Sequence, residues 1–123
     1  MSGIKITAEN ITVNAELNNS PTAKAIVNAL PIEGYVNTWG DEIYFEIPVD
    51  AGQESDARAD VEVGELGFWP VGNAFCIFFG RTPASTDDKP RAASPVNIIG
   101  KVLDDVSVLK SVPDGAKILI ERS

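Results

Sequence analysis

Apolar and polar residues alternate along several short segments of this chain, which is the pattern of half-buried β-strands. A tight turn is expected at Ala8-Glu9-Asn10 between the first two segments, and a second turn at Gly40-Asp41. In the segment after that second turn, Ile43, Phe45 and Ile47 share one face. Strands are expected at residues 4–7, 11–17, 35–36, 43–47, 74–79, 96–103 and 117–121.

Two segments have helical signals instead. Ser20 is a good N-cap and Pro21 suits the first helical position, so a helix is predicted over residues 21–29 and ended by Pro31. A second short helix is expected around Val106, Leu109 and Lys110, opened by Asp104 or Asp105. The polar stretches 50–60 and 81–95 are expected to be long loops.

The run "GFWPVGNAFCIFFG", residues 67–80, is apolar on both alternating faces and holds five of the nine aromatic residues. Proline lacks the N–H of a central strand, so residues 68–73 are expected to form an edge or corner. The strand that follows is expected to point Phe75, Ile77 and Phe79 into the interior. Its other side chains are then expected outside, under a cap or beside a groove: Ala74, Cys76 and Phe78.

Many short strands with occasional helices, no repeat and no domain break predict one domain over residues 1–123 with a closed barrel. The composition excludes several classes of function. The net charge of −8 disfavours nucleic-acid binding, and no apolar run is long enough to span a membrane. No signal peptide is visible and Cys76 is the only cysteine, so a cytoplasmic protein with a buried, inert thiol is expected. Histidine and glycine-rich phosphate loops are absent, so neither metal nor cofactor is expected.

Ile99-Gly100-Lys101-Val102, with Val108 and Leu109 after it, resembles the late strand-and-helix segment of cyclophilins. Residues 36–49, 61–83 and 93–102 are similar to the signature blocks of a prokaryotic cyclophilin-like family of unknown function, the Thermotoga-type proteins. The resemblance implies a mainly β fold: a closed eight-stranded antiparallel barrel capped by two short helices. It implies no activity.

Cyclophilins that isomerise prolyl bonds use an arginine within an early Phe-His-Arg block. Here the first arginine is Arg58, and the chain has no histidine. The resemblance therefore argues against an enzyme, and an isomerase with an atypical site, in which Arg81 reaches the pocket, is the alternative.

A binding module is the favoured function, taking a small molecule or peptide in an aromatic groove. Asparagine would supply orienting hydrogen bonds. The candidate residues are Asn37, Trp39, Tyr44, Trp69, Asn73 and Phe78, with Arg81 and Asn97 at the rim.

Each candidate has a simpler interpretation. The two tryptophans can be plain packing, Asn37 and Asn97 can tie turns to the backbone, and Arg81 can pair with Asp87 or Asp88.

Two further classes of function stay open. Three carboxylates near Tyr44, those of Asp41, Glu42 and Glu46, would suit acid–base chemistry, although a solvated turn is the favoured interpretation. Phe68 and Trp69 would suit an apolar patch for a weak homodimer.

Overall fold

Ten β-strands dominate the fold in the computed structural model, which describes residues 2–123. A nine-residue α-helix, α1 (Pro21–Ala29), and a six-residue 3-10 helix, η1 (Val106–Ser111), complete it. The strands are β1 (Ser2–Ala8), β2 (Ile11–Leu17), β3 (Ile32–Tyr35), β4 (Asn37–Thr38), β5 (Glu42–Glu46), β6 (Arg58–Asp60), β7 (Glu65–Trp69), β8 (Ala74–Phe78), β9 (Arg91–Val102) and β10 (Lys117–Arg122).

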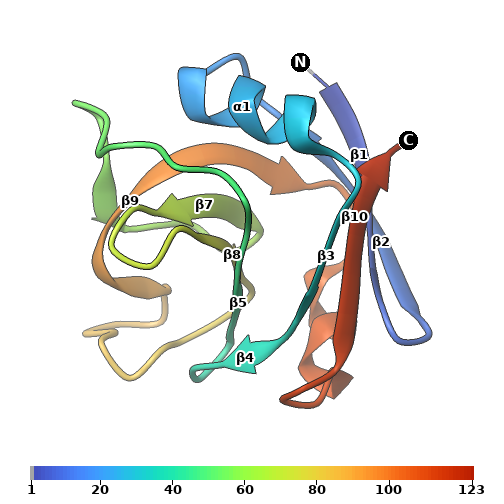
Figure 1. The fold of residues 1–123 in the computed structure, drawn as a ribbon. Coiled ribbons are helices and arrows are strands. Elements are labelled where there is room, and N and C mark those ends of the chain that lie inside the picture. The colour runs from blue at the N-terminus through green and yellow to red at the C-terminus, as the bar shows by residue number, and fades with distance from the viewer. Residues whose placement is uncertain (1) are drawn as a thin grey trace.

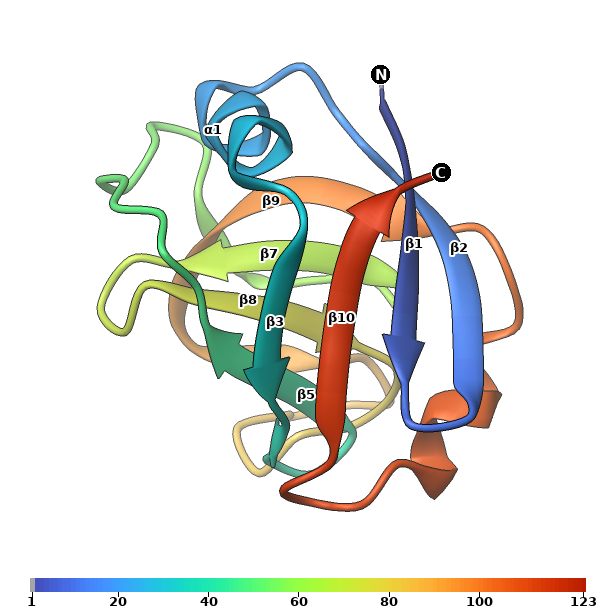
Figure 2. The ribbon, with the colours of Figure 1, turned by 45° about the vertical axis from the view of Figure 1, so that its right-hand side comes forward.

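The strands form one antiparallel sheet in the order β3-β10-β1-β2-β9-β7-β8-β5-β4, with β6 paired to β9. Figure 2 shows β3, β10, β1 and β2 side by side, with β7 and β8 crossing behind them. The long, curved β9 joins the two halves, because it pairs with β2 on one side and β7 on the other (Figure 1). The mainly β, antiparallel architecture expected from the sequence is confirmed.

The ends of the sheet are β3 and β4, which are separated in the chain by Val36 alone. Gly34 on β3 faces Phe45 on β5 so closely that a Cβ atom on Gly34 would lie 2.9 Å from Phe45 Cδ2. The sheet therefore curves until its ends pack against each other. Its hydrogen-bonded path does not return to β3 within residues 2–123, so closure of the barrel stays a prediction.

The structure has ten strands rather than the expected eight, and two segments expected to be loops contribute to the sheet. β6 lies at the end of the expected loop 50–60, and β9 begins at Arg91, inside the expected loop 81–95. The two pair through an irregular register, in which Arg58 faces Val96 and Asp60 faces Arg91. Such an irregularity tolerates Pro95 within a strand, and it hides the strand period in the sequence.

Both helices lie where the sequence places them. The Ser20 hydroxyl accepts a hydrogen bond from Ala23 N at 3.2 Å, which caps α1, and the Asp105 carboxylate accepts one from Ser107 N at 2.9 Å, which caps η1. The helices lie at opposite ends of the sheet (Figure 2). No helix within residues 2–123 has the length and apolar character needed to cross a bilayer.

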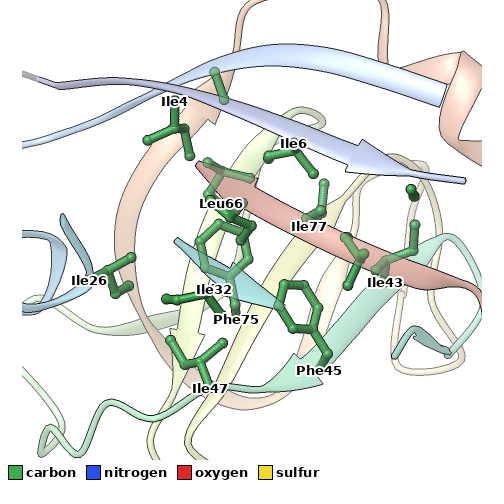
Figure 3. Packing of buried hydrophobic residues seen from close by; sticks show 14 of the residues in the cluster. Ile4, Ile6, Ile26, Ile32, Ile43, Phe45, Ile47, Leu66, Phe75 and Ile77 are labelled. Carbon is green, nitrogen blue, oxygen red and sulfur yellow. The ribbon is translucent and has the colours of Figure 1, made fainter. Parts of the chain in front are cut away.

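The main core fills the inside of the curved sheet and is built from isoleucine and phenylalanine (Figure 3). Phe45 and Phe75 stack there with ring centroids 5.5 Å apart. Phe75, Ile77 and Phe79 all belong to this core, so the predicted inward face of the strand is confirmed.

The opposite face of β8 is also covered. Ala74, Cys76 and Phe78 form a second apolar cluster with Val61, Ala92 and Val96, at whose margin Tyr44, Trp69 and Ile98 pack. The cover is therefore the chain around β6 and the first half of β9. The expected corner at residues 68–73 is wrong at its start, because Phe68 is completely buried and pairs with both Phe75 and Asn97. The turn occupies residues 70–73.

Candidate functional site

A cleft of about 210 Å³ opens at the margin of the second apolar cluster. Its walls are three aromatic side chains, one carboxyl group and one methyl group: Trp39, Tyr44, Trp69, Glu42 and Ala93. Glu42 and Tyr44 are two residues apart on β5, so they share its outward face. The cleft thus joins residues from β5, β7, β9 and the β4–β5 turn.

The β4–β5 turn places Trp39 above Glu42. Trp39 N donates to the Glu42 carbonyl at 3.0 Å and closes the turn, and Gly40 adopts a φ of 61°. A Cβ atom on Gly40 would also lie 2.8 Å from the Arg81 carbonyl oxygen, so both the conformation and the close approach require glycine.

Trp69 has a fixed orientation. Its indole N–H donates to Ser94 Oγ at 2.6 Å, and its ring meets that of Tyr44 edge to face, with centroids 6.5 Å apart and planes at 77°. Two walls of the cleft therefore stand nearly perpendicular. The indole N–H is used by Ser94, so the Trp69 wall offers its ring rather than its donor.

Glu42 is the charged residue of the cleft, and only 5% of its surface is exposed. Burial raises the pKa of its carboxyl from the ordinary 4.5 to about 7, against a smaller lowering by the Cys76 thiol beside it. A thiol is a weak donor, and Cys76 Sγ also faces the Ala74 carbonyl oxygen at 3.8 Å. Within residues 2–123 the Glu42 carboxyl makes no ion pair.

Cys76 itself is 1% exposed. Burial first, and the Glu42 charge second, raise the pKa of its thiol well above the ordinary value. A thiol held in the neutral form is a poor nucleophile.

Residues 2–121 match the protein family described as Cyclophilin-like. The chain belongs to the cyclophilin-like family. The family expected from the sequence is thereby confirmed.

Two solved structures share this cyclophilin-like fold. The solution structure of the hypothetical protein AF2241 from Archaeoglobus fulgidus matches with a TM-score of 0.83 and 40% sequence identity, over 99% of this chain and 95% of that one. The structure of McbB in complex with tryptophan matches with a TM-score of 0.69 over 98% of this chain, which spans 44% of McbB. At 15% identity, the likeness to McbB shows the fold alone. No curated protein matches the chain.

Three of the eight residues predicted for the groove of this cyclophilin-like chain meet in the cleft: Trp39, Tyr44 and Trp69. Phe78 is completely buried in the cluster behind them. Asn37 donates from Nδ2 to the Tyr44 carbonyl at 3.3 Å, so it supports the strand that carries Tyr44. Asn73 lies in the β7–β8 turn with a φ of 49°, and its carbonyl accepts from Ile47 N.

Arg81 is exposed. It contributes to the β4–β5 turn through its backbone, because its carbonyl oxygen accepts a hydrogen bond from Asp41 N. Within residues 2–123 its guanidinium forms no ion pair with Asp87 or Asp88.

Asn97 does not line the cleft, although it lies on β9 as Ala93 does, and its side chain is completely buried. Its Oδ1 accepts from Glu54 N at 2.8 Å, and its Nδ2 donates to the Gly52 carbonyl at 2.9 Å and to Thr22 Oγ1 at 3.0 Å. Glu54 in turn accepts a hydrogen bond from Thr22 N. Asn97 therefore ties the loop after β5 to the start of α1.

Two cleft residues were not among those predicted for the groove: Ala93, and Glu42, which the sequence suggested only for acid–base chemistry. The expectation that the carboxylates near Tyr44 are solvated is wrong for Glu42, which is buried, and right for Glu46, which is exposed. One signal was present: Glu42 stands two residues before Tyr44, on the same strand face. The cover over that face comes from β9, about 50 residues later in the chain, and the sequence pattern does not reveal it. The expected dimer patch is wrong for Phe68, because that side chain is completely buried.

Proposed function

We propose that this cyclophilin-like chain is a binding module for a small molecule, and that the cleft of Trp39, Tyr44 and Trp69 is its site. The observation that carries the proposal is the set of three aromatic walls around a buried carboxyl group, at the margin of the cluster that covers β8. Apolar and aromatic walls with a few polar groups are the usual composition of ligand sites.

Preorganisation supports the same proposal. The Trp69 ring is held in place by protein groups, the Ser94 hydroxyl and the Tyr44 ring, so binding costs little side-chain entropy. McbB, 44% of which matches this fold, binds tryptophan, a small aromatic molecule, and this agrees with the proposal. A volume of about 210 Å³ suits a small molecule, or one or two side chains of a peptide, better than a longer segment.

The isomerase alternative draws less support from this geometry. Arg81, the residue proposed to replace the catalytic arginine of cyclophilins, does not line the cleft and is exposed. Acceleration of cis–trans exchange in a Xaa-Pro peptide, abolished by Arg81→Ala, would restore that alternative.

Tryptophan fluorescence tests the proposal, because both tryptophans of the chain line the cleft. A metabolite and peptide library should contain compounds that shift the emission saturably. The two tyrosines provide a matched pair of variants. Tyr44→Ala removes a wall of the cleft and should weaken binding about tenfold or more. Tyr35 is 68% exposed on β3, and Tyr35→Ala should leave binding unchanged. A broad library that leaves both tryptophans unmoved would remove the proposal.

A further inference from the structure

The Glu42 carboxyl reaches the cleft without a strong partner of its own. Every side-chain nitrogen and oxygen atom sealed from solvent within residues 2–123 has a hydrogen-bond partner. Within the same residues, the Glu42 side chain forms no ion pair and has only the weak thiol donor of Cys76 beside it. Glu42 lines the cleft with 5% of its surface exposed, so the hydrogen-bonding capacity that its carboxyl has left is open to a molecule in the cleft.

The rest of the cleft wall carries no positive charge. Its other members are Trp39, Tyr44, Trp69 and Ala93. The Trp69 N–H donates to Ser94, so Trp69 offers the cleft its aromatic ring rather than that donor. Ring faces are negative at their centres, as a carboxylate is, so an anion entering the cleft would meet repulsion from both.

We propose that the cleft recognises a compact organic ammonium ion, held between the Glu42 carboxylate and the rings of Trp39, Tyr44 and Trp69. This inference rests on the proposed function and names its ligand class. Aromatic rings attract a cation most strongly where water is excluded, and the nearly perpendicular rings of Tyr44 and Trp69 offer two sides of such a cage. The carboxylate supplies the countercharge, which an ammonium N–H can meet by a charge-assisted hydrogen bond.

Shape-matched probes separate charge from size. Choline is a quaternary ammonium ion, and 3,3-dimethyl-1-butanol is the same shape with carbon in place of nitrogen. The corresponding carboxylate, 3,3-dimethylbutanoate, adds an anion. Titrations at pH 8 followed by tryptophan emission should give the order choline, then the alcohol, then the anion, with choline about tenfold or more tighter than the alcohol. Tryptamine against tryptophol, by calorimetry, makes the same comparison for a primary ammonium ion.

Two variants assign the preference to Glu42. Glu42→Gln keeps the shape and removes the charge, so it should lower choline and tryptamine affinity about tenfold or more and leave the neutral alcohols unchanged. Glu46→Gln is the matched control. Glu46 lies on the same strand but is exposed, and its substitution changes the net charge by the same amount. The comparison of probes on the unaltered protein stands even where a variant does not fold.

The outcomes distinguish this inference from the proposed function. If neutral or anionic compounds shift both tryptophans while choline, tetramethylammonium and tryptamine bind no more tightly, the ammonium inference is overturned and the binding module remains. Equal losses in Glu42→Gln and Glu46→Gln would also overturn it. If no compound of any charge perturbs Trp39 or Trp69, the proposed function fails as well.

Discussion

Tyr44 and Trp69 stand edge to face on the outer surface of the sheet, although they lie on strands that do not pair with each other. β8 runs between their strands, with Cys76 opposite Tyr44 and Ala74 opposite Trp69. Because Ala74 and Cys76 are small, two large rings can tilt over β8 and meet above it. The cleft beside these rings therefore depends on two large residues on β5 and β7 and two small residues on β8 between them.

Ser94→Ala should loosen Trp69. The variant removes the acceptor of the indole N–H, a loss of about 1 kcal/mol in unfolding free energy for a single hydrogen bond. Because the ring is then free to turn, affinity for any cleft ligand should fall about fivefold, which corresponds to about the same energy. Chemical denaturation and ligand titration measure the two effects. Ser55→Ala, at an exposed serine, is the control, and equal behaviour of the two variants would contradict this role of Ser94.

Ala93→Leu should fill the cleft. Ala93 is exposed at the cleft wall, so a larger side chain there projects into the space between the rings rather than into the core. Stability should change by no more than about 0.5 kcal/mol, as for other surface substitutions, while ligand binding should be lost. Thr86→Leu, on the exposed loop before β9, adds a leucine without touching the cleft. Undiminished binding in Ala93→Leu would place the ligand elsewhere.

Glu42→Gln should stabilise the protein at alkaline pH. Below pH 4.5 the Glu42 carboxyl is protonated in both states and its ionisation costs nothing. Between pH 4.5 and about 7 the unfolded chain releases the proton and the folded chain keeps it, so the native protein loses stability as pH rises. Above pH 7 the full cost is present, about 3 kcal/mol for a shift of this size.

The difference in unfolding free energy between Glu42→Gln and the unaltered protein should therefore grow by about 3 kcal/mol in favour of the variant between pH 4 and pH 8. Denaturant titrations at both pH values measure it. The exposed Glu46→Gln should show no such growth. A difference independent of pH would contradict the raised pKa of Glu42.

Asn97→Ala should destabilise the fold without touching the cleft. The substitution removes the three hydrogen bonds of the completely buried Asn97 side chain, those with Glu54 N, the Gly52 carbonyl and Thr22 Oγ1. The cost should be at least about 2 kcal/mol. Asn37→Ala, which removes an exposed amide, should cost much less. Ligand affinity should be intact in folded Asn97→Ala, because Asn97 does not line the cleft, and a selective loss of affinity would contradict this structural role.

The elements with local signals were predictable from the sequence. Ser20 and Pro21 mark the start of α1, and Pro31 marks its end. The alternation of Phe75, Ile77 and Phe79 identifies an inward face, because side chains of a strand point to opposite sides in turn.

The segments that depend on distant partners were not predictable. β6 and the first part of β9 are polar and contain Pro95, and an irregular pairing between them is what makes them strands. The burial of Glu42 has a similar origin. Its local sequence, Gly40-Asp41-Glu42, is typical of a solvated turn, and the other walls of its cleft include Trp69 on β7 and Ala93 on β9, far along the chain. Burying a carboxyl group costs free energy, so the sequence around Glu42 predicts an exposed side chain.

The cleft of Trp39, Tyr44 and Trp69 is the binding site that we propose. A fragment library of cationic, neutral and anionic compounds, followed by the ¹H–¹⁵N spectrum, tests it most directly, because the two indole N–H signals report on two walls of the cleft. We predict that the compounds that bind shift both indole signals and the amides of Glu42 and Tyr44. Compounds that bind saturably but shift only residues elsewhere, such as those near Asn10 and Pro113, would contradict the claim.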